Sequence, residues 1–209
     1  MQHGLFSSSA TYTLNLPQEA PGTTIFFALM SSKPEYNKKI NHMIALAPVG
    51  TVSHIDTMVK YLSHFYKELK SWMPIINDEL LTGTSLNTLM HFSQEYLAGR
   101  FQHFDYGSKE NTKRYGQEAA PEYDLTKVTA KVHLLWGMND YLADDADVQY
   151  LIKYLPNVRS RYPVPLKQFN HLDFLWAKDK MSLVYHPVLK MLSGYSITAE
   201  NEEASNIEL

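Results

Sequence analysis

An aspartate and a histidine follow two neighbouring strands predicted late in the chain. Asp140 comes directly after the short apolar run 132–136, and His171 lies in the loop after a weaker strand predicted at 158–164. Since loops at the carboxyl ends of parallel strands converge on one crevice, the two side chains are expected to be neighbours. A carboxylate that accepts a hydrogen bond from one imidazole nitrogen fixes the tautomer, so the other nitrogen can take a proton from a serine. The pair therefore predicts two members of a Ser-His-Asp triad.

Structural interpretations of these residues stay open on spacing alone. Aspartates after strands are common in turns and caps, and a histidine before a helix is often a hydrogen-bonding cap. Four aspartates form a cluster that lacks the glycine and distal glutamate of a calcium loop: Asp140, Asp144, Asp145 and Asp147. The histidines of region 51–125 lack H-x-x-x-H spacing. The sequence therefore predicts no bound metal and no cofactor.

Short apolar runs alternate with helical patterns in the rest of the chain. The predicted elements are, in order, a buried helix at 23–30, a central strand at 42–49, a strand at 132–136, a helix capped by Asp144 or Asp145, a weak strand at 158–164 and a last helix at 184–192 with Pro187 near its start. The first two strands are apolar without alternation, which is typical of parallel strands covered on both faces. This order predicts an α/β fold.

Region 51–125 differs from the segments on either side of it. Apolar residues recur there at helical spacing, so it is predicted to be a helical cap inserted into an α/β core formed by residues 1–50 and 126–195. The aromatic residues of the cap could face an apolar ligand, although ordinary packing explains the same pattern. The tail 196–209 is acidic and poor in apolar residues, so it is expected to be disordered.

Composition excludes several classes of function. The 209 residues carry a formal charge of −3 and no block of Lys or Arg, which argues against a nucleic-acid partner. The chain has no cysteine, which excludes disulfides, thiolate zinc sites and a cysteine nucleophile. No apolar run reaches the roughly 18 residues of a membrane span, and no signal-peptide pattern is visible. These features leave the compartment open.

Several motifs together resemble the acid lipases, which are the gastric and lysosomal lipases and their invertebrate relatives within the α/β-hydrolases. The matching segments, in chain order, are Gln2-His3-Gly4-Leu5, Gly22-Thr23-Thr24, Ala45-Leu46-Ala47-Pro48-Val49, His91-Phe92-Ser93-Gln94, Phe101-Gln102-His103-Phe104-Asp105-Tyr106-Gly107, Asn139-Asp140-Tyr141-Leu142-Ala143-Asp144 and Asn170-His171-Leu172-Asp173-Phe174-Leu175-Trp176. The resemblance covers essentially residues 1–195. It implies a partial α/β-hydrolase sheet with a helical cap insertion.

The resemblance also implies roles for three residues. Asp140 and His171 would be the acid and base of the triad, and the backbone N–H of Leu5 would be one oxyanion-hole donor. The implied substrates are neutral lipids or other fatty-acyl esters, hydrolysed through an acyl-enzyme. Relatives act in lysosomes or outside cells, so the resemblance alone does not fix the location of this chain.

The chain departs from the family where the nucleophile belongs. The family's serine stands in a G-x-S-x-G elbow, and this sequence has no such motif. Directly before Gly22, Ala20 takes the position of the serine and Pro21 that of the next residue, whose N–H would be the second oxyanion donor. Alanine has no hydroxyl and proline has no N–H. We therefore expect the chain to be inactive as an esterase.

Two origins are compatible with these departures, a deletion product of a complete lipase and a non-catalytic remnant that binds a lipid or a partner. Pro17 is separated from Gly22 by four residues, where the family places further strands of the sheet. Without those strands, segment 42–49 becomes a long apolar edge that invites self-association. The sequence therefore also predicts that copies of the chain can pair through this edge.

Overall fold

Three parallel strands form the sheet in the part of the chain that the computed structural model describes, residues 22–64 and 86–194. They are β1 (Met43–Leu46), β2 (Val132–Trp136) and β3 (Val158–Pro163), in the spatial order β1-β2-β3. In the register of the first pair, Met43 lies beside Val132 and Leu46 beside Leu135. The predicted α/β class is confirmed, since helices separate these parallel strands along the chain.

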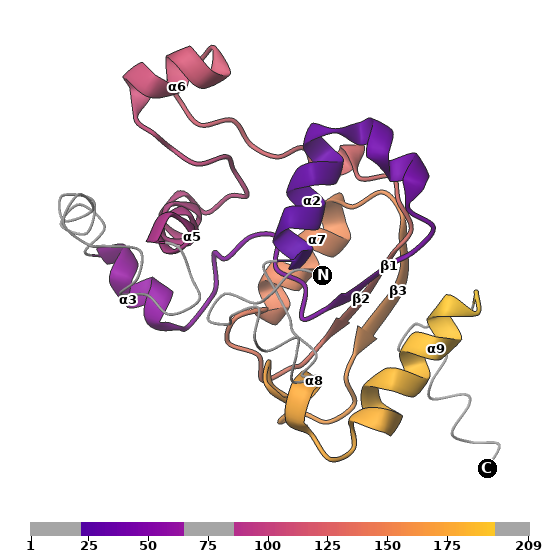
Figure 1. Ribbon diagram of the computed structural model, residues 1–209. Helices are drawn as coiled ribbons and strands as arrows, with labels where there is room; N and C mark the ends of the chain where they lie inside the picture. The colour runs from indigo at the N-terminus through magenta and orange to yellow at the C-terminus, as the bar shows by residue number, and fades with distance from the viewer. Residues whose placement is uncertain (1–21, 65–85, 195–209) are drawn as a thin grey trace.

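Helices cover both faces of the sheet (Figure 1). On one face lie α2 (Gly22–Ser32) and α7 (Asp145–Tyr154), and on the other lie α8 (Asp173–Trp176), the π-helical turn Met181–Tyr185 and α9 (His186–Leu192). Alternate residues of β2 enter the two cores, because successive side chains of a strand point to opposite faces. Leu134 packs with α2 and α7, and Leu135 packs with α8 and α9.

The predicted central strand 42–49 is shorter than expected, and it lies at an edge of the described sheet. β2 is the middle strand, and β1 ends at Leu46 because Ala47 takes a positive φ of 47°. That backbone conformation is uncommon for a residue with a Cβ, so it breaks the strand where the chain leaves the sheet. Self-association through this edge stays a prediction.

Local sequence patterns predicted most of the other helices and strands correctly. The helix predicted at 23–30 is α2, and Asp144 caps α7 by accepting a hydrogen bond from the Ala146 N–H at 2.8 Å. Pro187 lies in the first turn of α9. The predicted last helix 184–192 corresponds to α9, but its first two residues lie in the π-helical turn Met181–Tyr185, which the sequence did not predict. The predicted tail 196–209 lies outside the described residues.

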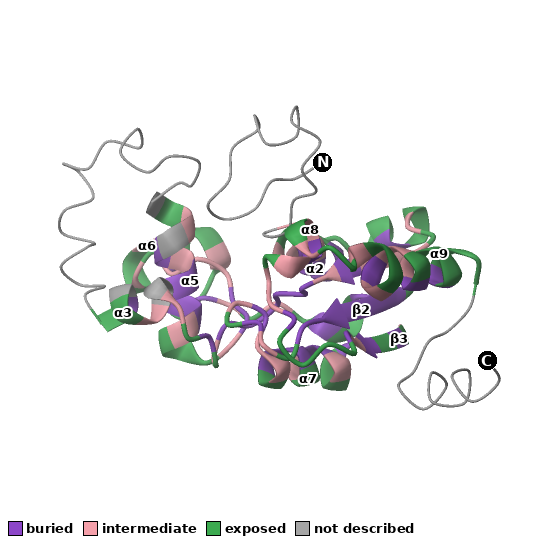
Figure 2. Cartoon of the chain, turned by 90° about the horizontal axis from the view of Figure 1, so that it is seen from below, coloured by how far each residue is buried: buried purple, intermediate pink, exposed green. Residues whose placement is uncertain are grey.

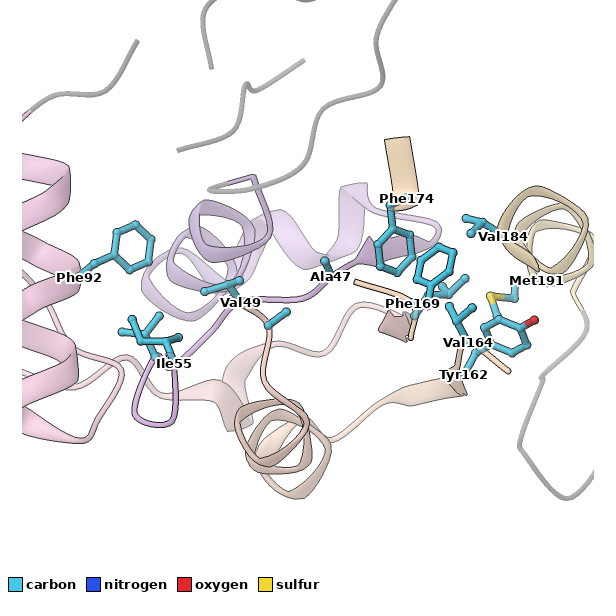
Figure 3. Close-up of a cluster of buried hydrophobic side chains, with 13 residues drawn as sticks. Ala47, Val49, Ile55, Phe92, Tyr162, Val164, Phe169, Phe174, Val184 and Met191 are labelled. Carbon is cyan, nitrogen blue, oxygen red and sulfur yellow. The ribbon is translucent and has the colours of Figure 1, made fainter. Parts of the chain in front are cut away.

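Among the described residues, three helices form a lobe beside the sheet: α3 (Met58–His64), α5 (Leu86–Ala98) and α6 (Ser108–Tyr115) (Figures 1 and 2). We call them the helical lobe, and we call residues 47–57, which lead into it, the neck. Two short 3₁₀ helices belong to the core, Pro34–Lys39 and Leu125–Lys127. Phe92 of α5 packs beside Val49 and Ile55 of the neck (Figure 3). No helix in the described ranges has the length and apolar character needed to cross a bilayer.

Candidate functional site

Asp140 and His171 meet at the carboxyl edge of the sheet. The Nδ1 atom of His171 lies 2.8 Å from Oδ2 of Asp140. The Asp140 side chain is fully buried, and that of His171 is 16% exposed. The contact places Nδ1 against the carboxylate, which is the way a carboxylate orients an imidazole in an acid–base pair. The structure thus brings the two predicted residues together, and their catalytic role stays a prediction.

Asp140 is held by the turn that follows β2. Its other oxygen, Oδ1, accepts hydrogen bonds from the backbone N–H groups of Leu142 and Ala143, both at 2.8 Å. The Asp140 N–H donates to the carbonyl of Gly137, which closes the turn. Both oxygens of the Asp140 carboxyl therefore have hydrogen-bond partners.

The histidine loop is attached directly to the acid loop. The N–H of Asn139 donates to the carbonyl of Phe169 at 3.1 Å. Within the histidine loop, Asn170 Oδ1 accepts from the Leu172 N–H at 2.9 Å, and Asp173 Oδ2 accepts from the Asn170 N–H at 2.8 Å. Hydrogen bonds before and after His171 therefore hold the histidine loop. The orientation of His171 depends on the backbone contact between this loop and the acid loop.

The start of α2 is fastened to the segment that follows β1. Val49 donates its N–H to the Thr23 hydroxyl at 3.0 Å, and the Thr24 hydroxyl donates to the Val49 carbonyl at 2.8 Å. This fixes the first turn of the helix that directly follows residue 21. Three residues of the sequence hypothesis, Leu5, Ala20 and Pro21, lie outside the described residues.

Large exposed apolar side chains occur in the two segments that carry the Asp140–His171 pair. We call four of them the apolar rim; each is between 51% and 59% exposed, and they are Met138, Tyr141, Leu172 and Trp176. Two come from the acid loop and two from the histidine segment. Single exposed apolar residues are ordinary, but four within segments 138–141 and 172–176, which flank Asp140 and His171, are more than scattered single exposures.

A second aspartate–histidine pair was missed by sequence reasoning. Asp147, one of the four clustered aspartates, is buried in α7 and accepts from both the ring and the backbone of His54, with distances of 2.9 Å to Nδ1 and 3.0 Å to the backbone N. Burial raises the pKa of Asp147, and the contact with His54 acts in the opposite direction. This pair ties the neck to α7. The two residues are far apart in the sequence, so no local pattern could have found the pair.

No cluster of three His, Asp or Glu side chains able to hold a metal ion occurs in residues 22–64 and 86–194. The four aspartates of region 140–147 separate into different roles. Asp140 pairs with His171, Asp144 caps α7, and Asp147 pairs with His54. Asp145 accepts from the indole N–H of Trp136 at 2.7 Å. Each carboxylate is therefore already engaged in the protein.

Comparison with known proteins finds sequence similarity to lipases. No family model matches the chain. It is 41% identical to Lipase 3 of Drosophila melanogaster over 113 residues, which cover 54% of this chain and 29% of that protein. It is 30% identical to the gastric triacylglycerol lipase of Mus musculus over 223 residues, which cover 82% of this chain and 56% of the lipase. The human gastric lipase gives 28% identity with the same coverage.

The similarity to a solved structure is weak. An α/β-hydrolase enzyme from the metagenome of lagoon sediments superposes with a TM-score of 0.43 and 12% identity, covering 84% of this chain and 60% of the other. The chain spans about half the length of the gastric lipases that it matches. Over about four fifths of its sequence, this chain is homologous to the acid lipases of the gastric type.

Proposed function

We propose that the chain is a lipase-lineage protein of neutral-lipid metabolism in which Asp140 and His171 are the acid and base of a carboxylic-ester hydrolase. The observation that carries this proposal is the 2.8 Å contact between His171 Nδ1 and Asp140 Oδ2, at the carboxyl edge of a parallel sheet. In such a dyad the carboxylate orients the imidazole, and Nε2 accepts the hydroxyl proton of a serine and later returns it to the leaving alcohol. The apolar rim suits the acyl chains of a neutral ester.

We further propose that this polypeptide does not hydrolyse esters by itself. Ala20 stands where the homologous serine is expected, and an alanine supplies no hydroxyl for attack. The alignment lengths support an internal contraction: the match to the mouse gastric lipase spans 223 positions, whereas 82% of this chain is about 170 residues. On this proposal, residues 1–50 and 126–195 are parts of the hydrolase core, and 51–125 is its cap.

The purified chain is expected to show no hydrolysis of triacylglycerol or short acyl esters above buffer, and no labelling by a fluorophosphonate probe for activated serines. Without an attacking hydroxyl, the dyad has no proton to accept. The assay compares the wild type with His171→Ala, using mouse gastric lipase as the positive control. Turnover or labelling that disappears in His171→Ala would show that an unrecognised serine completes the triad, and the proposed inactivity would be wrong.

A second candidate is lipid binding without catalysis, and the apolar rim is the observation that favours it. Oleic acid or monoolein is expected to raise the melting temperature of the wild type, because a ligand that binds only the folded state stabilises it. Leu172→Ser should lose most of this shift. Leu97→Ser, at a site on α5 that is 56% exposed, is the matched control and should keep it. An unchanged melting temperature in the wild type would remove the support for this candidate.

A further inference from the structure

Glu95 of α5 is a carboxyl group buried in the helical lobe. The residue is 0% exposed, and neither of its oxygens has a hydrogen-bond partner among residues 22–64 and 86–194. A buried carboxylate without donors is strongly disfavoured, whereas the neutral acid costs far less to bury. Burial accordingly raises the pKa of Glu95 well above its usual value, and the nearby Gln102 N–H opposes this only in part.

The nearest basic group does not neutralise Glu95. His91, one helical turn earlier, places Nε2 at 3.7 Å from Glu95 Oε1 but at 2.7 Å from the carbonyl oxygen of Gln102. A carbonyl only accepts, so His91 carries its proton on Nε2 and directs it at Gln102. Burial lowers the pKa of His91, so this imidazole is neutral at neutral pH.

The other groups around Glu95 are also uncharged. The segments 101–103 and 121–123 lie beside α5, joined by hydrogen bonds from Tyr123 N–H to Phe101 O at 3.0 Å and from His103 N–H to Pro121 O at 2.9 Å. His103 stacks on Tyr123, with 4.0 Å between ring centroids. Burial, then the Glu95 carboxyl, raises the pKa of Tyr123 to about 12, and burial lowers the pKa of His103.

Several charged groups of the same lobe form ion pairs with other residues. Arg100 forms an exposed ion pair with Glu122 at 3.4 Å. From α3, which packs along α5, Lys60 pairs with Asp56 at 2.8 Å. On α6, Glu110 pairs with basic residues of its own helix. An ionised Glu95 would therefore have no compensating charge in the described part of the lobe.

α5 links this buried cluster to the core. His91 and Glu95 face segment 101–103, whereas Phe92 and Tyr96 pack with the core cluster that includes the neck (Figure 3). A change in the packing of α5 therefore acts on two contacts at once, the internal packing of the lobe and its attachment to the neck. The protonation state of Glu95 therefore affects both the packing within the lobe and the attachment of the lobe to the neck.

We propose that Glu95 is a proton-dependent element of the helical lobe: while its carboxyl carries a proton, α5 stays packed on segments 101–103 and 121–123, and loss of the proton releases that packing. The lobe is then ordered under acidic conditions and opens more often as the pH rises. This inference concerns the lobe alone, so it does not depend on whether Asp140 and His171 act in catalysis.

Amide hydrogen exchange between about pH 6.5 and 8.5 tests the proposal, in a range where His91 and His103 stay neutral. After correction for intrinsic exchange rates, protection of the α5 amides in the wild type should fall by up to about tenfold per pH unit, since opening is linked to one proton. Glu95→Gln, which is neutral throughout, should remove this slope. Glu118→Gln, an exposed site in the same lobe, should keep the wild-type slope.

Infrared or carbon NMR observation of the Glu95 carboxyl in the wild type provides a second readout that needs no variant in the core. The signal of the protonated acid should persist over the pH range in which α5 loses protection, because only the rarely populated open form of the lobe is ionised there. A slope in Glu95→Gln equal to that of the wild type would overturn the proposal. So would an ionised Glu95 at about pH 6.5 in a fully protected lobe.

Discussion

Gly137→Ala is expected to destabilise the protein by about 3 kcal/mol and to disrupt the Asp140–His171 contact. A Cβ at position 137 would collide with the carbonyl oxygen and carbon of Phe169, which belong to the backbone and cannot rotate away. That backbone also accepts the Asn139 N–H and leads directly to His171. Making room for one methyl group therefore moves the histidine loop away from the acid loop.

Gly50→Ala is the matched control for this substitution. Its Cβ would meet the side-chain end of Leu151, which can shift at lower cost than a backbone carbonyl. Chemical denaturation gives the change in the free energy of unfolding, and a low-field proton resonance of His171 Nδ1–H reports the dyad. Gly137→Ala should lose the resonance, and Gly50→Ala should keep it. Equal stability of the two variants, with the resonance intact in both, would contradict the prediction.

Where local chemistry decides a feature, the sequence was sufficient to predict it. β2 is a short run that is apolar except for His133 and is followed by a glycine, and α7 begins at a capping aspartate followed by apolar positions at helical spacing. The Asp140–His171 contact followed from a rule of topology, because consecutive parallel strands end at the same edge. These predictions needed no knowledge of distant contacts.

Features set by distant contacts could not be predicted in this way. Asn37 illustrates the difference: its side-chain amide donates to the carbonyls of Met30, Pro34 and Lys127, and its oxygen accepts from the Ala130 N–H. The pair formed by Asp147 and His54 likewise joins residues that are distant in the sequence. In each case the partners are specified only after the chain has folded.

α6 was missed for another reason. Its sequence is almost entirely polar, so it has no apolar stripe that a periodicity search could detect. Within this helix, Glu110 pairs with Arg114 at 2.8 Å and with Lys113 at 3.3 Å. Such pairs add only a few tenths of a kcal/mol each, so they are a weak signal in a sequence. The sequence therefore predicted this segment only as part of the cap and did not identify it as a separate helix.

A chain of polar side chains crosses the sheet at the end opposite the dyad. His133 of β2 is 1% exposed; its Nε2 lies 2.9 Å from His42 Nδ1, and its Nδ1 lies 2.9 Å from the Ser160 hydroxyl. Burial, with the neighbouring charges of His42, Arg159 and Lys131, lowers the pKa of His133 to about 4. The folded protein therefore keeps this imidazole neutral at pH values where an unfolded chain binds a proton.

Acidification is expected to remove about 3 kcal/mol of stability through His133. Above about pH 6.5 the imidazole is neutral in both states, so it has no effect. As the pH falls from there towards about 4, the unfolded state binds a proton that the folded state excludes, and the free energy of unfolding decreases. Below that pH both states are protonated, and the loss from this group stops.

Comparing variants isolates this effect from other groups that titrate in the same range. Glu95 acts in the opposite direction, because its raised pKa favours the folded state in acid. His133→Gln should show a smaller acid-dependent loss than the wild type by about 3 kcal/mol, measured by denaturant unfolding at several pH values. His186→Gln, at an exposed histidine, should follow the wild type. An identical loss in His133→Gln and wild type would mean that His133 is already charged in the folded protein, which the buried contacts with His42 and Ser160 argue against.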